Sequence, residues 1–112
     1  MIRDKLKCPG GVVELEIADS FWRRMKGLLG RRSLPDGTGL LIPGCSSVHT
    51  AFMKFPIDVV YLDSNMNVCG LREHMEPFRM SSCPAARMTL ELPAGDAARY
   101  AIASGEPLSF VD

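Results

Sequence analysis

The segment from residue 57 to residue 63, IDVVYLD, constrains the fold of this chain more than any other stretch. After the aspartate at position 58, its residues are apolar on both alternating faces as far as Leu62, and several are β-branched. Strands of this composition are buried on both sides, as the central strands of a sheet are. The sequence therefore predicts that this segment is a central strand.

Shorter apolar runs, separated by glycine, proline and asparagine, predict further strands. The run at 12–17 (VVELEI) alternates, so it is predicted to be half-buried and to pair through a CPGG turn with the N-terminal segment. The run at 87–93 (RMTLELP) is expected to place Thr89 and Glu91 outward, with Glu91 at the surface or in a salt bridge across the sheet. The remaining predicted strands are 39–43, 68–75, which forms a hairpin with the central strand, and 107–111.

Two short helices are predicted near residues 20–30 and 95–104. In the first, Phe21, Met25 and Leu28 recur at a helical spacing and form one apolar stripe. Because the strands follow one another with few helical connections, an antiparallel β-sandwich or barrel is favoured. A length of 112 residues leaves room for one core, so residues 1–112 are expected to form a single domain.

The 13 basic residues balance 13 acidic ones, so no overall charge attracts nucleic acid or an anionic membrane. The basic cluster within residues 23–32 is expected to be the solvated face of the first helix. No signal peptide is visible, and no window approaches the roughly 20 apolar residues of a membrane span. We therefore expect a cytoplasmic protein without nucleic-acid or membrane partners, whose four cysteines are free thiols.

The segment 43–58, PGCSSVHTAFMKFPID, holds the residues that suggest a site. Cys45, His49 and Met53 lie four residues apart, so they would share one face of either a helix or a strand. Together they form a soft ligand set suited to Cu(I) or Zn(II). However, Gly44 and Pro56 indicate irregular backbone, and Cys and Met side chains mostly fill cores. We expect no resident metal or cofactor; a bound metal would have these three residues as ligands.

Nucleophilic catalysis is an alternative interpretation. Cys45 or Cys83, together with His49 or His74, would form a thiolate–imidazole pair. Such partners meet in space and not in sequence, and a lone histidine in a small β-domain is more often a hydrogen-bonded structural group. An enzyme is therefore kept as the alternative to a binding module.

Five stretches in order, MKGLLGRRSL, GTGLLI, FMKFPIDVVYLD, LELPAG and ASGEPL, resemble the bacterial and archaeal family called domain of unknown function 192. The resemblance covers the chain from Trp22 onward. It implies a compact, mainly β sandwich of jelly-roll type, in a family whose biochemical role is not established. The full fold prediction is therefore a single-domain antiparallel β-sandwich of jelly-roll type with two short helices.

The family's motifs can be carried over to individual positions. Its Gly-Leu-Met-x-Arg signature falls on Gly27, Leu28, Leu29 and Arg31, and its Met-Lys pair falls on Met53 and Lys54. Its strand-opening aspartate falls on Asp58, and its Leu-Glu-Leu-Pro-x-Gly motif falls on residues 90–95. The pattern singles out Arg31, whose side chain is expected to reach inward to a carboxylate.

Asp58 is the most diagnostic of these residues. Alternation places it on the same side as Val60 and Leu62, which predicts a buried carboxylate that must be paired, hydrogen-bonded or protonated. Its expected partners are Arg31, His49 or backbone amides of the preceding loop.

The function predicted is a module that binds a small molecule or a protein partner, with its site near residues 45–58. The binding residues predicted for it are Cys45, His49, Thr50, Met53, Asp58 and Arg31.

Overall fold

The computed structural model describes residues 2–18, 34–50 and 53–112. Within these residues it contains nine strands and one short helix. The strands are β1 (Ile2–Cys8), β2 (Gly11–Ile17), β3 (Thr38–Pro43), β4 (Ser47–His49), β5 (Ile57–Leu62), β6 (Val68–Met75), β7 (Met80–Ser82), β8 (Met88–Pro93) and β9 (Ser109–Phe110), and the helix is α2 (Asp96–Arg99). The prediction of a mainly β protein is confirmed.

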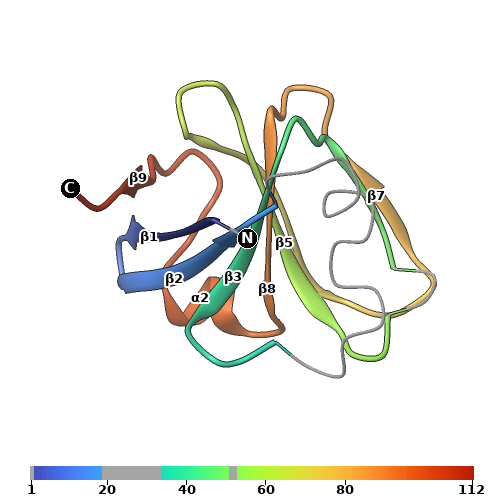
Figure 1. The fold of residues 1–112 in the computed structure, drawn as a ribbon. Helices are drawn as coiled ribbons and strands as arrows, with labels where there is room; N and C mark the ends of the chain where they lie inside the picture. Colours follow the sequence, from blue (N-terminus) through green and yellow to red (C-terminus); the bar gives the residue numbers. More distant parts are fainter. Residues whose placement is uncertain (1, 19–33, 51–52) are drawn as a thin grey trace.

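Seven strands form one sheet in the order β6-β5-β8-β3-β2-β1-β9, while β4 and β7 form a separate two-stranded sheet. Figure 1 shows β1, β2 and β9 at one side of the molecule and β7 at the other. Most neighbours are antiparallel, but β2 and β3 pair in parallel, so the large sheet is mixed. The expected all-antiparallel arrangement is wrong at this pair, because β3 runs in the same direction as β2. On its other edge, β3 pairs antiparallel with β8.

The predicted central strand is confirmed. β5 lies between β6 and β8, pairs antiparallel with both, and has all six residues buried. The hairpin between β5 and β6 and the hairpin between β1 and β2 also form where the sequence predicts them. The sheet therefore grows around the residues that most strongly favour a doubly buried strand.

The central strands separate two hydrophobic clusters, one on each face of the sheet. In β5, Val60 and Leu62 belong to the first cluster, and Ile57, Val59 and Tyr61 belong to the second. Each face of the strand thus contributes to a different core.

The outward placement of Thr89 and Glu91 is wrong. Both residues are buried, with Thr89 at 0% and Glu91 at 4% exposure. β8 lies between β5 and β3, and the face opposite Leu90 is covered by the second cluster, so alternation here separates two cores and not core from solvent. Glu91 is therefore an interior residue and not a surface one.

The second predicted helix is present but short. α2 ends at Arg99, because Tyr100 leaves helical geometry and Ala101 takes a positive φ of 54°. The helix predicted at 20–30 lies outside the described residues, as does Arg31. No helix in the described ranges is long and apolar enough to cross a membrane.

The β1–β2 turn packs directly on the chain after α2. The Gly10 amide donates a hydrogen bond of 2.8 Å to the Tyr100 carbonyl oxygen. A Cβ atom at Gly10 would lie 2.7 Å from the Tyr100 carbonyl carbon, closer than side-chain carbons approach backbone. A side chain at position 10 would therefore push this turn away from the residues that follow α2.

Candidate functional site

The residues of the 43–58 segment are spread over several environments. Cys45 lies just before β4, half-buried, and its thiol donates to the Ser47 carbonyl oxygen at 3.0 Å. His49 is the last residue of β4, and its side chain is exposed. The Cys45 thiol is thus hydrogen-bonded to the backbone of its own segment, and in the described part of the chain no hydrogen bond joins it to His49.

Thr50 is buried and ties the end of β4 to the loop before β7. Its hydroxyl donates to the Glu76 carbonyl oxygen at 2.7 Å and accepts from the Arg79 amide at 2.8 Å. Its backbone amide donates to the Arg79 carbonyl oxygen, and its carbonyl accepts from the Phe78 amide, each at 2.9 Å. Thr50 therefore ties the end of β4 to the loop before β7.

Met53 is a core residue, 5% exposed, in the second cluster. Cys45 packs at the edge of the same cluster. In residues 2–18, 34–50 and 53–112, no three His, Cys, Asp or Glu side chains are grouped so that they could hold a metal ion. The three predicted soft ligands lie in different surroundings, with Cys45 at the edge of the second cluster, His49 exposed on β4 and Met53 in the core.

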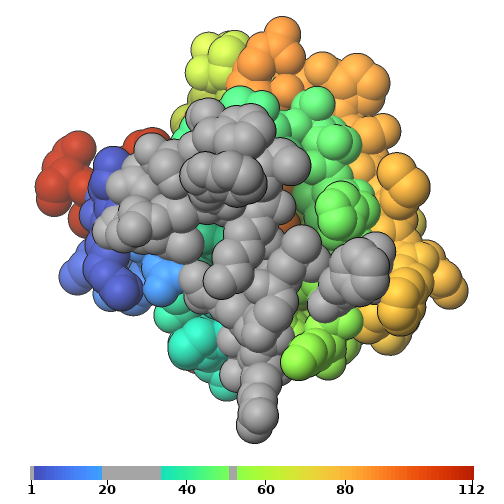
Figure 2. Space-filling model, turned by 45° about the vertical axis from the view of Figure 1, so that its right-hand side comes forward, coloured from blue at the N-terminus to red at the C-terminus, as the bar shows by residue number. Residues whose placement is uncertain are grey.

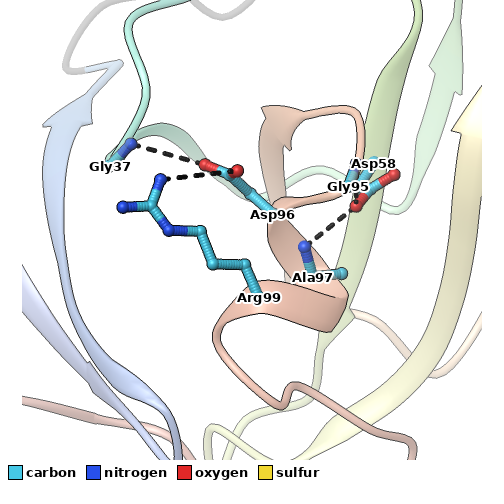
Figure 3. A network of polar contacts seen from close by, with 6 residues as sticks. All are labelled: Gly37, Asp58, Gly95, Asp96, Ala97 and Arg99. Carbon is cyan, nitrogen blue, oxygen red and sulfur yellow. Dashed lines mark hydrogen bonds and ion pairs between the residues drawn. The ribbon is translucent and has the colours of Figure 1, made fainter.

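Asp58 is fully buried, as predicted, and its carboxylate accepts three backbone N–H bonds. The donors are the amides of His74 at 2.8 Å, Gly95 at 3.0 Å and Ala97 at 2.9 Å. Figure 3 shows this carboxylate beside the start of α2. Backbone amides are thus the observed partners, but they come from β6, from Gly95 at the N-cap of α2 and from the first turn of α2 instead of the preceding loop.

The backbone that donates to Asp58 is irregular both in β6 and at Gly95, each of which has a residue with a positive φ. A bulge in β6 lies opposite Asp58, since Ile57 pairs with Met75 and Val59 with Arg72, and His74 within it has a φ of 51°. Three charge-assisted N–H bonds satisfy the buried carboxylate and hold this bulge against the turn at Gly95. Asp58 therefore acts as a structural latch on the face of Val60 and Leu62.

The opposite face of β5 carries an arrangement that the sequence did not indicate. Tyr61 is 1% exposed, and its hydroxyl hydrogen-bonds the Ser81 hydroxyl of β7 at 2.8 Å. Burial, together with the neighbouring thiols of Cys45 and Cys83, raises the pKa of Tyr61, while Ser81 and the Arg72 guanidinium partly oppose that shift. Cysteines, a phenol, serines and an arginine thus converge between β5, β6 and β7.

A hollow with a volume of about 360 Å³ lies beside Tyr61. Its lining residues are Ser47, Arg72, Met80, Ser81 and Ser82. They come from three strands, β4, β6 and β7. Figure 2 shows the green residues around β4 and the orange residues around β7 side by side, in keeping with the pairing of Ser47 with Ser82.

β7 was missed because its three residues, MSS, show no alternation of apolar and polar side chains. A strand this short and polar has no signal of its own, and the pairing with β4 is visible only in three dimensions. The sole local hint was the turn chemistry that surrounds it, with Pro77 before and Pro84 after.

The structure has all four cysteines as free thiols. Burial raises the pKa of the Cys8 thiol to about 11. Burial, and then the neighbouring Cys83 thiol, raise the pKa of the Cys69 thiol to about 11. Both groups are therefore almost entirely protonated at neutral pH, and the thiolate is the form that reacts.

We expect native-state alkylation at pH 8 to spare Cys8 and Cys69. With a pKa near 11, only about one thiol in a thousand is ionised at that pH, so these two cysteines should react at least about tenfold slower than Cys45. Their rates should rise as the pH approaches 11. Pulse labelling with iodoacetamide followed by peptide mass spectrometry measures each site. Equal rates at all four sites in folded protein would contradict the expectation, and denatured protein provides the reference.

The described residues define a small, mainly β protein built on one curled, mixed sheet, with a two-stranded sheet that borders a polar hollow. Residues 5–110 match the model of the domain of unknown function 192 family, described as "Uncharacterized ACR". The chain belongs to this family, as its motifs predicted.

One curated relative is a "UPF0127 protein" of Thermococcus sibiricus, 29% identical over 100 residues. The match covers 85% of this chain and 64% of the relative, so the chain spans less than two-thirds of that protein's length.

Two solved structures share the fold. A protein of unknown function from Novosphingobium aromaticivorans has a TM-score of 0.82 at 20% identity, covering 96% of this chain and 84% of its own. A chain from Sinorhizobium meliloti, called a putative transcription regulator, has a TM-score of 0.83 at 22% identity, covering 96% of this chain and 92% of its own. These likenesses concern the fold alone.

Proposed function

We propose that this protein is a ligand-binding module, and that the hollow between β4, β6 and β7 takes a small molecule with an anionic oxygen group. The observation that carries the proposal is a hollow of about 360 Å³ in which one guanidinium and three hydroxyl-bearing residues converge. Ligand pockets typically measure roughly 300–1,000 Å³ and combine a few placed polar groups with apolar walls. Ser47 belongs to the 43–58 segment, which supports the predicted position near residues 45–58.

Arg72 sets the chemical class of the ligand. Its planar fork of N–H donors matches the two oxygens of a carboxylate or phosphate. Within the described ranges its guanidinium has neither a hydrogen bond nor an ion pair, so these donors are available to a bound molecule. The neighbouring serines, Ser47, Ser81 and Ser82, add hydroxyls that can donate to further oxygens, and Met80 adds an apolar wall.

A catalytic role for Cys45 and His49 receives no comparable support. The Cys45 thiol is bonded to the Ser47 carbonyl, and the His49 side chain is exposed at the end of β4. Asp58 and Met53, also predicted as binding residues, are interior and contribute to the module by holding its frame.

The test is a binding screen with inorganic phosphate, small carboxylates and sugar phosphates, followed by chemical shifts of the Ser47 and Ser81 amides. At least one anion should bind with shifts at these positions. Arg72→Gln should weaken binding about 10- to 100-fold, as expected for loss of charge-assisted hydrogen bonds.

Lys7→Gln is the matched control, because it removes the same charge from an exposed residue of β1, on the other side of the molecule. It should leave affinity unchanged. Binding by none of the anions, or equal weakening in the two variants, would contradict the proposal.

A further inference from the structure

Two cysteines from separate strands meet beside Tyr61. Cys69 lies in β6 and Cys83 directly follows β7, and their sulfur atoms are 3.6 Å apart. The Cys83 thiol also lies 3.6 Å from the Cys69 carbonyl oxygen, and the Cys69 thiol points to the Tyr61 carbonyl oxygen at 3.5 Å. The Cys83 thiol thus donates a hydrogen bond to the Cys69 sulfur, and no covalent bond joins the two sulfur atoms.

The local backbone builds this contact. A bulge in β6 leaves Cys69 as the extra residue between the pairs Leu62–Val68 and Tyr61–Gly70, and bulges redirect side chains in this way. Gly70 gives Cys83 room, since a Cβ atom there would lie 3.2 Å from the Cys83 sulfur. The Cys83 amide donates to the Ser46 carbonyl oxygen at 2.8 Å, which anchors Cys83 to the chain just before β4.

Both thiols are reachable from solvent. Cys69 and Cys83 are partly exposed, whereas Cys8 is buried. A disulfide has an S–S distance of about 2.05 Å, so the sulfur atoms need to approach by roughly 1.6 Å. Cys83 lies outside regular secondary structure, where rotation of its side chain supplies such a movement.

We propose that Cys69 and Cys83 form a reversible oxidation site, at which a hydroperoxide converts the two thiols into an intramolecular disulfide. The Cys83 thiolate attacks the peroxide O–O bond, which gives a sulfenic acid and releases water, or an alcohol from an alkyl hydroperoxide. The Cys69 sulfur then displaces the sulfenic hydroxyl, forms the S–S bond and releases water. Two thiols lose two electrons and two protons, and the peroxide is reduced by the same two electrons.

The environments of the two sulfurs favour this order. Burial and the adjacent Cys83 raise the pKa of the Cys69 thiol to about 11, so Cys69 is a poor first nucleophile. Once Cys83 is oxidised, the Cys69 sulfur is already in contact with it, and the second step is intramolecular. The inference depends on the two thiols and their backbone, and not on a ligand in the neighbouring hollow.

The test uses the full chain, reduced and then exposed to a small molar excess of hydrogen peroxide. Wild-type protein should lose two titratable thiols and two hydrogen atoms of mass, and peptides containing Cys69 and Cys83 should be cross-linked. Dithiothreitol should restore four thiols. A disulfide-linked dimer, a link through Cys45, or sulfinic acid on Cys83 without a link to Cys69 would overturn the proposal.

Single substitutions identify each partner. In Cys69→Ser, Cys83 should stop at a sulfenic acid that dimedone traps, and no internal disulfide should form. Cys45→Ser is the control, because Cys45 borders the same cluster, and it should change the rate of disulfide formation by less than about twofold. An internal disulfide that persists in Cys69→Ser would refute the assignment, and the measurement on wild-type protein stands even if that variant folds poorly.

Discussion

Asp58→Ala should lower the free energy of unfolding by about 2–4 kcal/mol, because it removes a buried acceptor and leaves buried N–H groups without a partner. The donors left without an acceptor would be the backbone amides of His74, Gly95 and Ala97. In the described structure, no other buried carboxylate links these two segments of the chain. Chemical denaturation followed by tryptophan fluorescence or circular dichroism measures the loss. We also expect faster amide exchange at Gly95 and Ala97.

Asp63 is the internal control for this prediction. It follows the same strand and also accepts backbone bonds, from the Asn65 amide at 2.8 Å and the Asn67 amide at 3.0 Å, but in a solvent-facing turn. Asp63→Ala should cost about 1 kcal/mol or less, as the loss of a turn cap does. Asp58→Asn keeps one acceptor and turns an N–H₂ group toward a donor, so its cost should lie between the two. Equal losses for both alanine variants would mean that the Asp58 latch contributes nothing beyond a turn.

Gly10→Ala should be nearly as damaging, with a loss of about 2–3 kcal/mol from overpacking against rigid backbone. The added methyl would lie within 3.0 Å of three backbone atoms of Tyr100, so either the β1–β2 turn or the chain after α2 has to move. Displacement would also stretch the 2.8 Å bond from the Gly10 amide to the Tyr100 carbonyl. In chemical denaturation, the midpoint denaturant concentration should fall, while the dependence of the unfolding free energy on denaturant concentration should stay unchanged.

Pro9→Ala, one residue earlier in the same turn, is the comparison. Pro9 is exposed, and its replacement should cost less than about 1 kcal/mol, mainly through greater freedom of the unfolded chain. If Gly10→Ala is no worse than Pro9→Ala, then the close approach to Tyr100 does not hold the hairpin in place.

The parts of the fold that could be predicted from sequence are those with a strong local pattern. β5 was predictable because branched apolar residues on both faces fit only a doubly buried strand, and the same pattern placed Asp58 in the interior. The β5–β6 hairpin followed from the turn residues between two such runs. These features depend on neighbours in the chain, so a single sequence contains them.

What could not be predicted depends on residues distant in sequence. Glu91 alternates like a surface residue, and only the position of β8 between β5 and β3 shows that its face is covered. β4 and β7 have three residues each, too few for a periodic signal. The contact between Cys69 and Cys83 needs a bulge in one strand and the end of another, which no spacing reveals.

The sheet order also bears on how the chain acquires its structure during synthesis. β3 and β5 emerge from the ribosome well before β8, yet they are not neighbours, and β8 is the strand that fills the space between them. Until residues 88–93 are made, the nascent chain has two partial sheets, each with an unsatisfied edge of the kind that promotes aggregation. Completion of the sheet is therefore a late, long-range event, which slows folding and makes the time before β8 appears the vulnerable one.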